Sequence, residues 1–147
     1  MTNLNLPTYS FKIKSKENIL YIFDILRKKN VVLTPEEWVR QNYIQFLISE
    51  KKYPKSHIAI EKQLKINNLI KRTDILIFDK NGLPYIIVEC KSPKVKITQD
   101  VFDQIAKYNL KLKAKYLIVT NGIKHFYCQM DHQQMKYDFL KEIPGYS

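Results

Sequence analysis

Three charged residues stand beside two apolar stretches that are close together in the sequence. Asp74 comes just before the first stretch, and Glu89 and Lys91 end the second. Side chains alternate between the faces of a strand, so Glu89 and Lys91 would share one face. Two carboxylates and an ammonium, brought together by a hairpin, could hold a hard cation with an acid or base beside it. This chemistry is that of metal-assisted phosphodiester hydrolysis.

The surroundings of Glu89 decide between two interpretations. The simpler one is an exposed edge strand with a Glu–Lys ion pair, which contributes little free energy. However, the preceding residues, Tyr85-Ile86-Ile87-Val88, favour a buried central strand. An Asp, a turn at Asn81-Gly82 and then Glu-x-Lys at the end of an apolar strand resemble the catalytic core of the PD-(D/E)xK nuclease superfamily.

Composition places the chain among globular proteins. Its 147 residues, 45% of them hydrophobic, predict one domain over residues 1–147. No run of 18 or more apolar residues predicts a membrane span, and the N-terminal residues do not resemble a signal peptide. Cys90 and Cys128 form neither a disulfide framework nor a zinc pattern. These features predict a cytoplasmic protein without membrane partners.

The net charge of +11 and the pI of about 9.6 favour a polyanionic partner. The alternative is a lysine-rich composition that only solvates the surface. The basic clusters are spread along the chain, at Lys12–Lys16, Arg27–Lys29, Lys51–Lys55 and Lys111–Lys115. Charge is therefore supporting evidence only.

Apolar patterns and turn residues predict an α/β order. Thr34 is expected to cap a helix that begins at Pro35 and runs to about Ser49. A second helix is predicted from Gln99 to about Leu112, and a short one in the tail at Gln134–Lys141. The predicted strands are Phe11–Lys14, Ile19–Phe23, Ile58–Ile66, Leu69–Asp79, Tyr85–Lys91, Tyr116–Thr120 and Ile123–Tyr127. This order predicts a central mixed β-sheet flanked by helices.

The first predicted helix offers a further carboxylate. At about 100° per residue, Glu36 and Arg40 fall on the apolar face, one turn apart, while Glu37 lies nearer its margin. An inward-facing Glu beside an inward-facing Arg could serve the site. A capping or salt-bridge role for Glu36 at the helix N-terminus is equally open.

The second predicted helix carries Gln104 and Tyr108 on one stripe. They could simply satisfy each other at the edge of the core. Alternatively, they could hydrogen-bond to Lys91, to a scissile phosphate or to a base.

Taken in order, these elements resemble a known family. The series is Thr34-Pro35-Glu36-Glu37, Arg72-x-Asp74, Glu89-Cys90-Lys91 and Gln104-x-x-x-Tyr108. It is similar to the N-terminal nuclease domain of type I restriction enzyme R subunits, in a compact stand-alone form, over about residues 10–145. The resemblance implies a restriction-endonuclease-like core at about residues 34–128, preceded by strands at about 10–24.

The resemblance also implies roles for particular residues. Asp74 and Glu89 would bind Mg²⁺ or Mn²⁺, together with the Cys90 carbonyl, and Lys91 would assist catalysis. Glu36 would be the helix carboxylate, with Glu37 as the alternative. Residues expected to position the DNA backbone are Arg40, Arg72, Gln104 and Tyr108.

The same resemblance bears on partners. It implies DNA as substrate and other restriction-system subunits as partners. The sequence contains no G-x-x-x-x-G-K-[ST] loop, so no nucleotide cofactor is expected. A nucleic-acid-binding module that does not cut, or an interaction subunit with a basic face, are the alternative functions.

Overall fold

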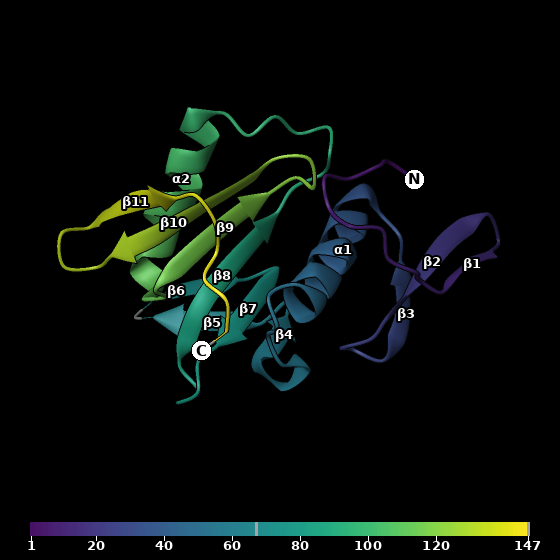
Figure 1. Cartoon of the computed structure of the whole chain (residues 1–147), viewed down its shortest axis with the longest axis horizontal. Helices are drawn as coiled ribbons and strands as arrows, with labels where there is room; N and C mark the ends of the chain where they lie inside the picture. Colours follow the sequence, from purple (N-terminus) through teal and green to yellow (C-terminus); the bar gives the residue numbers. More distant parts are fainter. Residues whose placement is uncertain (67, 147) are drawn as a thin grey trace.

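The structure is a computed structural model that describes residues 1–66 and 68–146. Its centre is a six-stranded mixed sheet in the order β11-β10-β9-β8-β7-β4 (Figure 1). Only β8 and β9 pair in parallel; the other neighbours are antiparallel. The strands are β4 Ile58–Ile60, β7 Ile75–Phe78, β8 Pro84–Cys90, β9 Tyr116–Thr120, β10 His125–Asp131 and β11 Lys136–Leu140.

Each face of this sheet is covered by a helix, α1 (Pro35–Ser49) on one side and α2 (Gln99–Asn109) on the other. Side chains along β8 alternate between the two faces of the sheet, so the hydrophobic core consists of two clusters, one under each helix. Val88 and Cys90 pack with the residues of α1, whereas Ile87 packs with the residues of α2. The restriction-endonuclease-like arrangement, a central mixed sheet flanked by helices, is thereby confirmed.

Helix α1 begins where the sequence predicts. Thr34 has extended backbone angles, and its side chain accepts a hydrogen bond of 3.0 Å from the Glu37 N–H. Pro35 follows as the first helical residue, where its missing N–H costs nothing. This cap fixes the point at which the chain enters the helix.

The predicted hairpin between β7 and β8 is also present. Asp79 accepts hydrogen bonds from the backbone of Asn81 and Leu83, and Gly82 has a φ of +78°. A glycine adopts such a φ without steric cost. The turn thus sets the register in which Ile75 pairs with Val88.

A three-stranded antiparallel sheet precedes α1. It consists of β1 (Ile13–Lys16), β2 (Ile19–Asp24) and β3 (Lys29–Val32). We call it the N-terminal sheet; Figure 1 shows it to the right of α1, apart from the central sheet. The sequence predicts two of these strands but not β3, which is short and largely polar and forms by pairing with β2.

Two predicted elements differ from those observed. The expected strand Ile58–Ile66 is interrupted at Glu61, whose φ is +53°, so that β4 joins the central sheet and β5 (Gln63–Ile66) pairs with β6 (Leu69–Arg72). The tail predicted to be helical at 134–141 contains β11 instead, because Lys136–Leu140 finds a partner in β10. The predicted second helix ends earlier, with a 3₁₀ turn at Leu110–Leu112. None of the helices in the described part of the chain is long and apolar enough to cross a membrane.

Candidate active site

Asp74 lies in the bend between β6 and β7, opposite the end of β8. Because Ile75 pairs with Val88, the antiparallel register continues to Asp74 and Glu89. The Asp74 carboxylate is fixed by the backbone N–H of Cys90, which donates to Oδ2 over 2.7 Å. The hairpin therefore brings the first two sequence-predicted residues to neighbouring positions.

Glu89 is a buried carboxyl group with only 6% of its surface exposed. Burial raises its pKa above the usual range, and the charge of Asp74 raises it further, whereas Lys71 and Lys91 act in the opposite direction. Its Oε1 atom is buried and accepts no well-aligned hydrogen bond within the described chain. A buried oxygen in this state is costly unless a cation approaches it.

The cation that approaches Glu89 is Lys71, from β6. Its Nζ lies 3.0 Å from Glu89 Oε1, although the angle is not that of a hydrogen bond. The same ammonium lies 5.0 Å from the centre of the Tyr108 ring. The sequence predicts Lys91 near Glu89, beneath Gln104 or Tyr108. Lys91 does act on Glu89 through its charge, but the ammonium that contacts Glu89 and the Tyr108 ring is that of Lys71. Lys91 is partly buried just after β8, and its backbone N–H donates a hydrogen bond of 2.8 Å to the Thr120 carbonyl.

The Cys90 side chain lies on the opposite face of β8 from Glu89. Its thiol is buried in the core on the α1 side of the sheet. Burial raises the pKa of the thiol well above its usual value, and the Asp74 charge adds to that effect. The neutral thiol is a poor metal ligand, so only the backbone carbonyl of Cys90 is available for the predicted role.

Helix α1 contributes Glu37 and Arg40 to a buried ionic network. Arg40 Nε donates to Glu37 Oε2 over 2.9 Å, Arg40 Nη2 lies 3.3 Å from Glu61 Oε1, and Arg40 Nη1 lies 4.0 Å from Asp74 Oδ1. Burial would raise the pKa of the Glu37 carboxyl, but hydrogen bonds from Arg40 and Gln41 lower it below its usual range. Arg40 thus links the helix carboxylate to Asp74.

The network continues into the N-terminal sheet. Arg27, in the turn after β2, contacts Asp24 at 2.7 Å and Glu37 at 3.1 Å. Gln41 donates to Asp24 Oδ2 over 2.9 Å and to Glu37 Oε2 over 3.0 Å. Asp24 is fully buried; these hydrogen bonds overcome the effect of its burial and lower its pKa. The N-terminal sheet is consequently held in one orientation against α1.

Glu36 lines the same hollow as Arg40 and Asp74 but is exposed in the first turn of α1. Glu37, the alternative in the sequence analysis, is 6% exposed and bonded to Arg40. Glu37 is therefore the buried carboxylate of this helix. Helical periodicity placed Glu37 at the margin of the apolar face, but Arg27 and Asp24 of the N-terminal sheet pack against that part of the helix. The sequence alone does not reveal these contacts.

The second helix is turned differently from the prediction. Its buried residues are Phe102, Ala106 and Asn109, so Gln104 is exposed. Tyr108 is partly buried and donates a long hydrogen bond of 3.4 Å to the Ile70 carbonyl. Arg72 is exposed on β6. Of the four predicted DNA-positioning residues, only Arg40 lies beside the carboxylates.

A pocket of about 400 Å³ opens between α1 and the N-terminal sheet. Its charged lining consists of Arg27, Arg40, Glu36, Glu37, Glu61 and Asp74. Both guanidinium groups are already paired with carboxylates, and the carboxylates outnumber them, so this hollow favours a cation.

A comparison with protein families gives the decisive observation. Residues 35–144 match the family described as the type I restriction enzyme R protein N terminus. The chain belongs to this family. A search of curated proteins found no match. The family match begins at the first residue of α1, so it includes Asp74, Glu89 and Lys91 and leaves out the N-terminal sheet.

Two carboxylates of this R-protein N-terminal domain, Asp74 and Glu89, are candidate ligands for a divalent cation. Within residues 1–66 and 68–146, no three His, Cys, Asp or Glu side chains form a ready-made metal cluster. Asp74 and Glu89 supply two carboxylates, and Glu89 Oε1 is buried without a hydrogen bond. Mg²⁺ retains several waters and needs only one or two carboxylates, so this donor set fits Mg²⁺ or Mn²⁺.

Sequence reasoning missed several residues of this site, namely Asp24, Arg27, Gln41, Glu61 and Lys71. Among them, only Asp24 could have been found from the sequence pattern. It follows Leu20 and Ile22 at intervals of two, so the alternation of β2 places this acid on the same face as two apolar residues. The others come from turns and from β6, and their contacts depend on tertiary structure.

Proposed function

We propose that this protein is a divalent-metal-dependent nuclease that cleaves phosphodiester bonds in DNA. The observation that carries the proposal is the position of Asp74 beside Glu89, a buried carboxyl group whose Oε1 atom already contacts a cation, the Lys71 ammonium, at 3.0 Å. Membership of the R-protein N-terminal family supports the same conclusion. Asp74, Glu89 and the Cys90 carbonyl would hold Mg²⁺ or Mn²⁺.

Each residue has a defined task in this proposal. Asp74 stays oriented because the Cys90 N–H holds one oxygen and Arg40 lies near the other. Lys91 donates hydrogen bonds that position the attacking water against the scissile phosphate. Arg40 and Arg27 offset the carboxylates of the pocket beside Asp74, so that a phosphate held by the cation can approach. A bound divalent cation supplies the positive charge that offsets charge developing on the phosphate oxygens.

The expected partners follow from this activity. DNA is the substrate, and other subunits of a restriction system are the expected protein partners. These 147 residues contain no P-loop motif, so a motor activity would lie outside them.

A second candidate function is supported by the ion pair between Lys71 and Glu89. An ammonium at 3.0 Å already neutralises part of the charge that a metal would use. In this alternative, the protein binds DNA without cutting it. Salt-dependent DNA binding with no metal-dependent cleavage would identify this function.

Nicking of supercoiled plasmid in the presence of Mg²⁺ or Mn²⁺ distinguishes the two functions. Wild type is compared with Lys91→Ala and with the control Lys94→Ala, since Lys94 is exposed three residues further on. We expect metal-dependent nicking by wild type and the control, and a rate at least about 100-fold lower for Lys91→Ala. Equal nicking by all three, or none with either metal, would overturn the nuclease proposal.

A further inference from the structure

The N-terminal sheet has one strongly basic face. Lys14 pairs with Tyr21 and Lys16 pairs with Ile19, so these residues share a face, and Lys12 lies over the Phe23 ring at the same side. The opposite face contains Ile22 and Asp24, which are buried toward α1. We call the face with Lys12, Lys14 and Lys16 the lysine face. The strand positions on it include no acidic residue.

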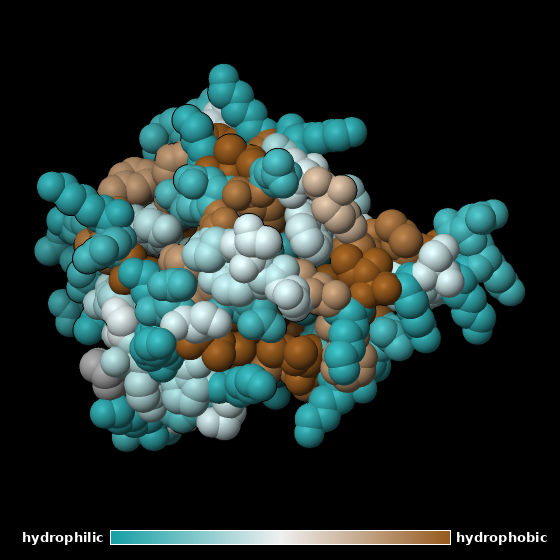
Figure 2. Space-filling view, turned by 45° about the vertical axis from the view of Figure 1, so that its right-hand side comes forward, coloured by the Kyte–Doolittle hydropathy of each residue, from teal (hydrophilic) through white to brown (hydrophobic). Residues whose placement is uncertain are grey.

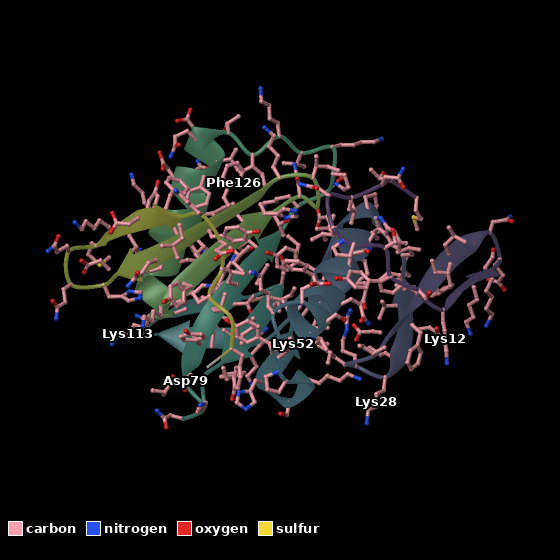
Figure 3. All side chains as sticks on the ribbon, viewed as in Figure 1. Lys12, Lys28, Lys52, Asp79, Lys113 and Phe126 are labelled. Carbon is pink, nitrogen blue, oxygen red and sulfur yellow. The ribbon has the colours of Figure 1, made fainter. Side chains whose placement is uncertain are left out.

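The lysine face is accessible. Lys12, Lys14 and Lys16 are all exposed, and so is Ile19 beside them. Figure 2 shows long hydrophilic side chains that project from the right-hand end of the molecule, around a band of hydrophobic residues. Figure 3 places Lys12 and Lys28 at that end, far from Lys113.

The N-terminal sheet is held close to the candidate active site. Arg27 and Asp24 bond to Glu37 and Gln41 of α1, and Val31 and Val32 of β3 line the same pocket as Asp74. The pocket opens on the α1 side of this sheet, and the lysine face reaches it at the β3 edge, where Val32 lies. The family match begins after this sheet, so family membership assigns it no role.

We propose that the lysine face binds the phosphate backbone of duplex DNA and holds the duplex at the β3 edge of the pocket that Asp74 lines. This inference rests on the proposed function for its choice of DNA. Three alternate strand residues span about 13 Å, a length over which duplex DNA carries about eight charges. Lysines position a protein on phosphates, whereas they are depleted in the centres of protein–protein interfaces.

Fluorescence anisotropy with a labelled duplex tests this proposal in EDTA, where no cleavage occurs. Wild type is compared with the triple variant K12Q/K14Q/K16Q over a series of salt concentrations. The matched control is K111Q/K113Q/K115Q, which removes the same charge from exposed lysines at the other end of the molecule. Circular dichroism checks that all variants are folded, and K14Q/K16Q, which keeps Lys12 over Phe23, is the second variant.

We expect K12Q/K14Q/K16Q to weaken binding by at least about tenfold and to lower the slope of log K against log salt by about 2 to 3. The control should lose less than half as much affinity. Equal losses in both triple variants, or no loss in K12Q/K14Q/K16Q, would overturn the proposal, as would no binding of duplex by wild type. A wild type that binds through this face but never nicks plasmid would refute the nuclease function and leave the lysine face supported.

Discussion

Lys71 Nζ lies 3.0 Å from Glu89 Oε1, and it reaches that position from a separate two-stranded sheet. Glu89 belongs to the central strand β8, whereas Lys71 belongs to β6, which pairs only with β5. The ammonium compensates a buried carboxylate that has no hydrogen bond at the same oxygen. It therefore occupies the side of Glu89 that a divalent cation would need.

Removing this ammonium should strengthen metal binding. We expect Lys71→Met to bind Mn²⁺ on the order of tenfold more tightly than wild type at pH 8. The reason is that a nearby positive charge repels the metal and competes for Glu89. Isothermal titration calorimetry measures the affinity directly.

Lys65→Met is the matched control for this variant. Lys65 lies on β5, pairs with Ile70 and is exposed, so its removal leaves Glu89 untouched. If Lys71→Met bound Mn²⁺ as weakly as wild type, or more weakly, Lys71 would not compete with the metal.

Glu89 should make the stability of the metal-free protein depend on pH. Its folded pKa is raised by burial and by Asp74, so the unfolded chain ionises first as the pH rises above about 4.5. The contribution of Glu89 to stability is therefore greatest at low pH and declines until the pH exceeds the raised pKa. Glu89→Gln lacks this titration.

Urea unfolding in EDTA at pH 4 and pH 7.5 checks this sign. We expect the free energy of unfolding of Glu89→Gln minus that of wild type to be larger at pH 7.5 than at pH 4, which means that the variant gains stability relative to wild type as the pH rises. Asp24 and Glu37 are present in both proteins, so their lowered pKa values largely cancel in the difference. A difference that stays constant or changes in the opposite direction would argue against the raised pKa.

Glu36 and Glu37 should differ sharply in their effect on stability. Glu37→Gln removes the buried carboxylate that both Arg40 and Arg27 contact, and should cost about 3 kcal/mol. Glu36→Gln changes an exposed residue of the first helical turn and should cost less than about 1 kcal/mol. Urea unfolding at pH 7 measures both. Similar losses for the two variants would contradict the buried position of Glu37.

The elements that rest on local signals were predictable. Thr34 and Pro35 define the start of α1, and the apolar residues before Glu89 predict the central strand β8. The hairpin turn then determines that Asp74 and Glu89 are neighbours. Each of these features depends on residues that are close in the sequence.

The remaining features depend on contacts between distant segments. Glu37 is buried because Arg27, from the N-terminal sheet, contacts it. Lys71 reaches Glu89 because the extended strand is interrupted at Glu61, after which β5 and β6 pair with each other. Strand β11 exists because β10 offers it a partner. Helical periodicity and turn propensity contain no information about these neighbours, so the corresponding predictions failed.

The most direct test of the proposed metal site is a titration of the metal-free protein with Mn²⁺, followed by the electron paramagnetic resonance signal of the free ion. Wild type should bind one Mn²⁺ per chain, because Asp74 and Glu89 together form one site. Glu89→Gln should lose this binding, whereas Glu36→Gln should retain it. Binding that is unchanged in Glu89→Gln, or absent from wild type, would contradict a metal site at Asp74 and Glu89.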